Sequence, residues 1–142
     1  MQPVAINCWA VLVCGLFSLG LGSLWYGPLF GKQWMAMSGI NPEGMTESQK
    51  KGMWKSYLLA LIGSLLMAFV LAHSLLFAES YLKISGFNAG LQVGFWSWLG
   101  FVGPVTLGMV LWEGKSWKLW TLLNGYYLIQ LLVFGAILAW WK

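Results

Sequence analysis

The sequence contains no arginine and no aspartate, one histidine, and two cysteines among its 142 residues. Charged residues make up only 8% of the chain, whereas they make up about a quarter of a soluble protein. The chain offers no Ser-His-Asp set, no paired carboxylates at depth, no His/Cys cluster and no phosphate-binding glycine loop. Because hydrolytic, redox-metal and nucleotide chemistry lack their parts, we predict a protein that is not an enzyme and holds no metal or cofactor.

Charge is also missing from four long stretches, which cover residues 1–31, 56–78, 84–112 and 119–141. About 20 apolar residues are enough for a helix to cross the ~30 Å hydrocarbon core of a bilayer. The hydrophobic fraction of 59% and the eleven tryptophans agree with this environment, because tryptophan favours the membrane–water interface. The sequence therefore predicts an all-α, polytopic membrane protein, with residues 1–142 forming a single four-helix transmembrane domain.

The expected spans are residues 6–26, 57–78, 87–112 and 117–141, with a loop over residues 32–55 that contains helix-capping signals. Most lysines fall in the first and third connections, and cytoplasmic loops carry such an excess. The lysines of these two connections are Lys32, Lys50, Lys51, Lys55, Lys115 and Lys118, against Lys83 and Lys142 on the other side. We therefore predict that both connections are cytoplasmic and that the N- and C-termini are extracytoplasmic.

The lysines also bear on partners. The net charge is +4, but the lysines are scattered and form no basic run with aromatic residues, which is a poor match to a nucleic-acid surface. The lipid bilayer is the expected partner, and nucleic acid is not. Cys8 and Cys14 stand six residues apart on one expected helix, so we predict free, packing thiols.

Small residues recur along the second and third spans. Helices associate in lipid by close backbone approach, which small side chains permit. We expect these two faces to pack against each other or against a neighbouring protomer, and the spacing leaves the partner open. The packing candidates are Ala60, Ser64, Ala68 and Ala72 in the second span, after Ser56, and Gly86, Gly90 and Gly94 in the third. Pro104 should kink the third span near mid-membrane.

Polar residues inside the expected spans are the candidates for a pocket or pathway, because they are costly in lipid. His73 alone changes charge near neutral pH. A neutral imidazole bonded to a neighbouring helix, a ligand or proton site, and an axial haem ligand are the interpretations open for it. Asn124 is followed by Gly125, which lets a ligand or another backbone approach it. The full set is Asn7, His73, Asn88, Gln92, Asn124 and Gln130.

The two halves of the chain resemble each other weakly. Leu24-Trp25-Tyr26-Gly27 at the end of the first span is similar to Leu111-Trp112-Glu113-Gly114 at the end of the third. A true duplication would produce two parallel helix-hairpin repeats, related by an axis along the membrane normal. Interfacial tryptophan and loop glycine are common enough for coincidence to remain the alternative.

Several blocks of sequence resemble the bacterial domain-of-unknown-function 1761 family. The blocks begin at Asn7-Cys-Trp, run from Gly22 through Trp34, and continue with Trp98-Leu-Gly-Phe, Glu113-Gly-Lys and Asn124-Gly-Tyr. The resemblance covers nearly the whole chain and implies a small four-span protein of the bacterial inner membrane, without an established activity. Within it, Trp25, Tyr26, Gly27 and Pro28 look like a shaped helix exit, where Pro ends the helix and Gly permits the turn.

Three classes of function remain from this reasoning. The leading hypothesis is a non-enzymatic membrane helix bundle that assembles as a homo-oligomer or as an accessory subunit of a membrane complex, because packing signals are strong and chemistry is missing. The alternative is a small oligomeric transporter or channel for a neutral or weakly basic solute, lined by the polar candidates. A membrane-embedded enzyme or haem protein that depends on His73 is the third.

Overall fold

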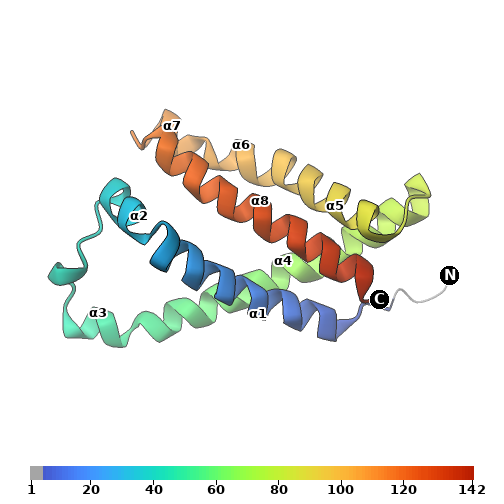
Figure 1. Cartoon of the computed structure of the whole chain (residues 1–142), viewed down its shortest axis with the longest axis horizontal. Helices are drawn as coiled ribbons and strands as arrows, with labels where there is room; N and C mark the ends of the chain where they lie inside the picture. Colours follow the sequence, from blue (N-terminus) through green and yellow to red (C-terminus); the bar gives the residue numbers. More distant parts are fainter. Residues whose placement is uncertain (1–4) are drawn as a thin grey trace.

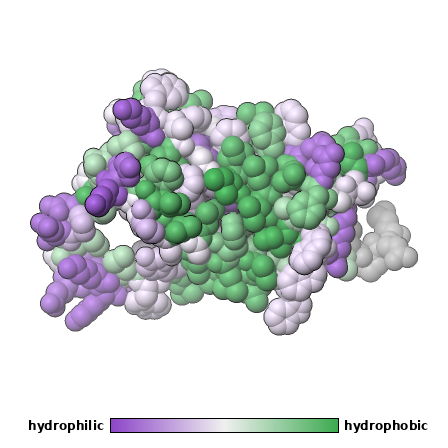
Figure 2. All heavy atoms as spheres, in the orientation of Figure 1, coloured by the Kyte–Doolittle hydropathy of each residue, from purple (hydrophilic) through white to green (hydrophobic). Residues whose placement is uncertain are grey.

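The computed structural model describes residues 5–142, and this part of the chain folds into helices without a strand. Four helical segments are long and apolar enough to cross a membrane, which confirms the predicted fold class. They cover Cys8–Leu29, Glu47–Leu82, Gly86–Leu111 and Trp117–Trp140. Hydrophobic residues form a broad band across the middle of the molecule, and hydrophilic residues gather at its two ends (Figure 2).

The four spans form two hairpins of consecutive helices. Helix α1 (Cys8–Leu24) packs along α4 (Met53–Leu82), and α5 (Gly86–Ser97) packs along α8 (Trp117–Trp140). Helix α8 also contacts α1 and α4, so it occupies the centre of the bundle (Figure 1). Lys142, just after α8, forms an ion pair with Glu79 near the end of α4. The ends of α4 and α8 therefore lie at the same end of the bundle.

The first span bends where the sequence suggests a helix exit. A π-turn over Trp25–Leu29 follows α1, with the Phe30 N–H donating to the Trp25 carbonyl at 2.9 Å. Gly27 leaves the helical region with φ −109° and ψ −107°. The chain does not stop at Pro28 as expected, because it continues through this bend into α2 (Gly31–Ser38). Helix α2 then reaches the start of α8, where the Ser116 hydroxyl donates to the Met37 sulfur at 3.9 Å.

The loop between the first two spans carries two capped helical turns. Asn41 caps the 3₁₀ turn Pro42–Gly44 by accepting from the Glu43 N–H at 3.0 Å. Thr46 and Gln49 form the predicted capping box of α3 (Glu47–Lys51), which leads into α4. The capping signals of this loop are thus confirmed, since each side chain satisfies a backbone N–H that a helix start leaves free.

The third span is broken into short helices. After α5 come a π-turn (Trp98–Val102), α6 (Gly103–Thr106) and α7 (Gly108–Leu111). The Gly103 N–H bonds to the Trp98 carbonyl across the π-turn, immediately before Pro104. A distortion at Pro104 was predicted and is confirmed. Proline lacks the N–H that would continue the α-helical pattern, and the wider turn accommodates it.

The small-residue faces pack, but not against each other, which was one of the two arrangements expected. Gly90 and Gly94 face α8, where a Cβ on Gly90 would overlap the carbonyl oxygen of Gly135. The buried part of the α4 face comprises Ser64, Ala68 and Ala72. Ala60 is exposed, and Gly86 is exposed because it forms the turn into α5 with φ +69°.

The two hairpins share one local feature, although at a different register from the one expected. Trp112, which we matched to Trp25, follows α7 and is exposed. Trp98 instead begins a π-turn of five residues, as Trp25 does. The structural counterpart of Trp25 is therefore Trp98, and each hairpin has a π-turn in its first helix.

Candidate functional site

The buried polar side chains of the bundle gather in two clusters on α8. We name them the Asn124 cluster and the Gln130 cluster. Asn124 and Gln130 are each only 1% exposed, and they lie six residues apart on the central helix. Their partners come from α1, α4, the π-turn of the third span, α6 and α8 itself. Those partners are Trp98, Thr106 and Trp120 for Asn124, and Ser18 and Ser64 for Gln130, with Tyr126 joining the Gln130 cluster through Ser18.

The Asn124 cluster ties α8 to the broken third span. The Asn124 amide donates to the Trp120 carbonyl at 3.0 Å, and its side-chain oxygen lies 3.1 Å from the Thr106 hydroxyl. The Trp120 indole donates to the same hydroxyl at 3.1 Å, and the Trp98 indole donates to the Asn124 carbonyl at 3.1 Å. Each polar atom of the Asn124 side chain thus has a protein partner, so the amide acts as a cross-brace between helices.

The Gln130 cluster joins three helices near the middle of the bundle. The Gln130 amide donates to the Ser18 hydroxyl at 2.7 Å, and the Ser18 and Ser64 hydroxyls lie 2.8 Å apart. The Tyr126 hydroxyl bonds to Ser18 at 3.3 Å, through the backbone carbonyl or the hydroxyl. Within the described residues, the Gln130 side-chain oxygen is buried without a partner. This cluster fixes the rotation of α8 against α1 and α4, because any other rotation would leave more polar atoms unpaired in lipid.

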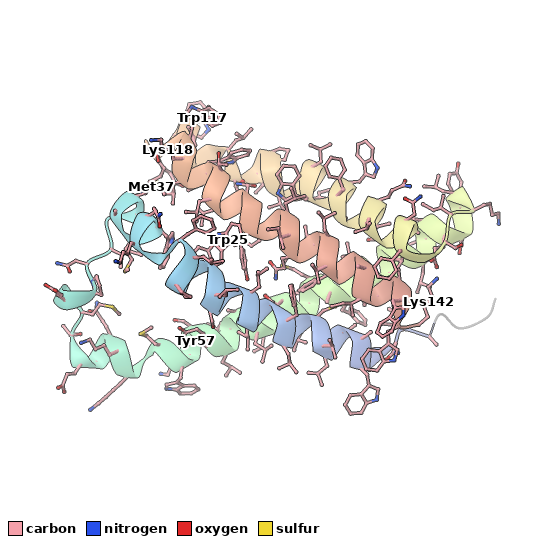
Figure 3. The ribbon with its side chains drawn as sticks, in the orientation of Figure 1. Trp25, Met37, Tyr57, Trp117, Lys118 and Lys142 are labelled. Carbon is pink, nitrogen blue, oxygen red and sulfur yellow. The ribbon has the colours of Figure 1, made fainter. Side chains whose placement is uncertain are left out.

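The helix-bend residues also act on α8. The Trp25 indole donates to the Leu122 carbonyl at 3.2 Å, two residues before the Asn124 carbonyl that Trp98 reaches. A Cβ on Gly125 would meet the Trp25 ring at 3.4 Å, so the glycine leaves the indole room to lie against α8. Figure 3 shows Trp25 pointing from the first span toward α8. The two equivalent tryptophans therefore hold one short segment of α8 from both hairpins.

Tyr26 belongs to an aromatic group beside this segment. Its ring centroid lies 5.2 Å from that of Tyr126 and 4.9 Å from that of Trp34. Gly27 and Pro28 are exposed at the bend and contribute backbone shape only. The residues of the expected helix exit are thus divided, since Trp25 and Tyr26 pack inward while Gly27 and Pro28 shape the backbone.

The other four candidates for a polar pathway do not join these clusters. Asn7 caps α1 by accepting from the Trp9 N–H at 3.0 Å, and its amide reaches the Trp141 carbonyl at 3.4 Å. His73 bonds through Nδ1 to the Phe69 carbonyl of its own helix at 2.9 Å. The Gln92 amide donates to the Asn88 side-chain oxygen at 2.9 Å on the outer part of α5. These residues occupy separate places, so they form no continuous path through one protomer.

The chemistry that the buried clusters offer is limited to hydrogen bonding. Their side chains are amides, hydroxyls and indoles, which hold helices in register but carry no charge. Among the described residues, no three His, Cys, Asp or Glu side chains gather as a metal site. Cys14 is buried and Cys8 is exposed, and both thiols are free.

Sequence reasoning identified Asn124 and Gln130 but missed most of their partners. Ser18 lies 46 residues from Ser64 and 112 residues from Gln130 along the chain. No local spacing connects residues so far apart, and a serine or tyrosine in an apolar span does not show which helix it meets. Ser64 is a packing candidate by sequence, and it also bonds within the Gln130 cluster. Its hydroxyl was the one available signal that the small-residue face of α4 meets a polar group.

A groove on the outside of the bundle separates α4 from α5 and the π-turn after it. Two adjoining pockets form it and share Ser74, Ser97 and Phe101. The inner pocket is closed at its base by Leu131 of α8. The remaining walls are mostly apolar and include Leu66, Met67, Val70, Ala78, Val93 and Trp96. This groove offers a ligand an extended, mostly apolar recess.

Comparison with known proteins supplies a family but no activity. No curated protein and no solved structure matches the chain. The family described as "Protein of unknown function (DUF1761)" matches residues 9–139, which include both hairpins and both buried polar clusters. The chain therefore belongs to the domain-of-unknown-function 1761 family.

Proposed function

We propose that this protein is a non-enzymatic membrane helix bundle that assembles with other helices in the bilayer, as a homo-oligomer or as an accessory subunit. The observation that carries this proposal is the exposed start of α4. Every residue from 53 to 60 is exposed, including Trp54 and Leu59. This segment lies where α1 and α4 diverge toward the first loop, so the start of one long helix projects from the bundle (Figure 1).

The projecting segment has a face suited to close contact. Ser56, Ala60 and Gly63 are spaced by four and three residues, which places them on one side of a helix. A Cβ on Gly63 would meet nothing within 4 Å, so the space above it is open. Burying apolar surface gives helices no drive to associate in lipid, whereas small residues let backbones approach. We name these three residues the α4 contact face.

The polar clusters support a structural role over transport through a single protomer. Asn124 and Gln130 bond to neighbouring helices and are closed off from the surface. A solute path would therefore have to lie between protomers. Ser56 is the one polar residue of the α4 contact face, so this face gives little support to such a path. We also propose that residues 32–55 face the cytoplasm of a bacterial inner membrane, with the ends of α4 and α8 outside, because this loop holds four of the lysines.

The test is a count of protomers in lipid. The full chain, labelled with one fluorophore, is placed in vesicles at low density, and its stoichiometry is read by single-molecule photobleaching. We expect more than one bleaching step, or a second membrane protein that co-purifies from the native membrane. Gly63→Ile should lower this association at least tenfold, because it fills the α4 contact face.

The matched control is Gly20→Ile on α1. Gly20 is also exposed, and a Cβ added to it would meet nothing within 4 Å. Of the residues three or four positions away from it, only Ser23 is small. The Gly20→Ile variant should leave association unchanged. A protein that is monomeric and carries no partner, or equal effects of the two variants, would contradict the proposal.

A further inference from the structure

The groove between α4 and α5 has the length of a lipid chain. Its walls run along α4 from Leu66 to Leu82, which is about 24 Å at 1.5 Å per residue. One leaflet contributes about half of the ~30 Å hydrocarbon core. The groove is therefore long enough for one extended acyl chain that enters from the end where α4 meets α5.

The lining of the groove favours an apolar ligand. The Ser74 hydroxyl donates to the Val70 carbonyl of its own helix at 3.1 Å, and the Gln92 amide donates to Asn88 at 2.9 Å. The Ser74 hydroxyl and the Gln92 amide N–H therefore have protein partners before a ligand binds. The remaining surface is made mostly of aliphatic and aromatic side chains, which suit hydrocarbon.

The end of the groove at the turn from α4 to α5, which we call its mouth, has a lysine next to it in the chain. Lys83 lies in the turn from α4 to α5, between the lining residues Leu82 and Ile84. Glu79, one turn earlier, is paired with Lys142, and no ion pair is formed by Lys83 within residues 5–142. The first turn of α5 has no acidic residue, and Ser85 does not cap it with its side chain. Its free N–H groups and the helix dipole add to the attraction for an anion.

The geometry points to a phospholipid-binding site, with one acyl chain in the groove and the anionic phosphate of the headgroup beside Lys83 and the start of α5. An apolar groove that ends at a turn with a lysine matches the acyl chain and the anionic headgroup of a phospholipid. A second transmembrane helix could fill the groove, but it would place no phosphate beside Lys83. The charge at the mouth therefore favours the lipid over a helix.

The site is separate from the proposed assembly face. Its walls on α4 begin at Leu66, whereas the α4 contact face ends at Gly63. Lipid binding therefore does not depend on the proposed function, and the two can fail independently.

The experiment is a lipid titration followed by native mass spectrometry. The full chain is delipidated in mild detergent and titrated with phosphatidylglycerol, or with diacylglycerol that carries the same chains and no phosphate. We expect one tightly held phosphatidylglycerol per protomer and weaker retention of diacylglycerol. Because a lysine near anionic lipid contributes about 1 kcal/mol, Lys83→Asn should weaken phosphatidylglycerol binding about fivefold.

Two variants distinguish binding of the acyl chain from binding of the headgroup. Ser97→Phe fills the part of the groove that both pockets share, and it should abolish retention of both lipids. Lys83→Asn should affect phosphatidylglycerol alone, and asparagine tolerates the left-handed backbone at this position, where φ is +57°. The matched controls are Ser23→Phe on α1 and Lys115→Asn in the turn at the other end of the bundle, with circular dichroism to check folding.

Several outcomes would overturn the inference. Equal lipid retention by the wild-type protein and folded Ser97→Phe would show that the groove is not the site. Equal effects of Lys83→Asn and Lys115→Asn would remove the headgroup contact. A lipid-free dimer that Ser97→Phe dissociates would assign the groove to a second copy of the chain.

Discussion

Helices α4 and α8 are both long and apolar, yet they are buried to different extents in the bundle. The apolar window of α4 has the higher mean hydropathy, 2.2 against 1.8 for α8, but it is only 28% buried where α8 is 44% buried. The difference lies in the residues that interrupt the apolar surface. Helix α8 carries Asn124, Gln130 and Gly135, which bond to or closely approach other helices. In a bilayer, hydropathy places a helix in the membrane, whereas polar and small residues place it in the centre of a bundle.

The largest expected difference comes from adding the same side chain to a glycine of α5 that faces α8 and to an exposed glycine of α4. Gly90→Val forces a branched side chain into the Gly135 backbone of α8, and we expect a loss of about 3 kcal/mol, at the upper end of overpacking effects. Gly63→Val on α4 enters open space and should change stability by less than about 0.5 kcal/mol. Reversible unfolding in bicelles measures both. Equal losses would contradict the central position of α8.

A second pair of variants compares buried and exposed asparagines. Asn124→Leu removes the bonds to Thr106 and Trp120 and leaves the Thr106 hydroxyl to its own helix. We expect a loss of about 1–2 kcal/mol, since interhelical hydrogen bonds in membranes contribute about 0.6–2 kcal/mol. Asn88→Leu on exposed α5 surface should cost less than about 0.5 kcal/mol. The same unfolding assay reads both variants, and a neutral Asn124→Leu would remove the bracing role of the cluster.

The smallest expected effect concerns the indole bond at the bend. Trp25→Phe keeps an aromatic ring against Gly125 but loses the bond to the Leu122 carbonyl, at a cost of about 0.6 kcal/mol. Trp9→Phe, at an exposed position, serves as the control and should leave stability unchanged. A Trp25→Phe variant as stable as the control would show that ring packing alone holds the bend to α8.

The arrangement of charge was sufficient to predict the fold class. The four spans and the capped loop follow from local signals, because bilayer thickness sets span length and capping depends on residues three apart. The bend at Pro28 was predicted as an end, since sequence does not show that a π-turn and Gly31 carry the helix onward.

The partners in the interior could not be predicted in the same way. Gly90 and Gly94 were recognised as a packing face, but their partners on α8, Gly135 and the Leu131 backbone, were not named. Asn124 and Gln130 were recognised as costly polar groups, while Ser18 and Thr106 were not. A single helix shows which residues permit contact, and the partner depends on how several helices rotate together.

Disulfide cross-linking in native membranes tests whether α4 projects from the bundle to meet another helix. Ala60→Cys is introduced after Cys8→Ser and Cys14→Ala, with Val105→Cys on α6 as a control at another exposed position. We expect an oxidant-dependent adduct, either a dimer of this chain or a heavier complex with a second membrane protein, for Ala60→Cys and not for Val105→Cys. A monomer alone, or the same adducts for both variants, would contradict this expectation.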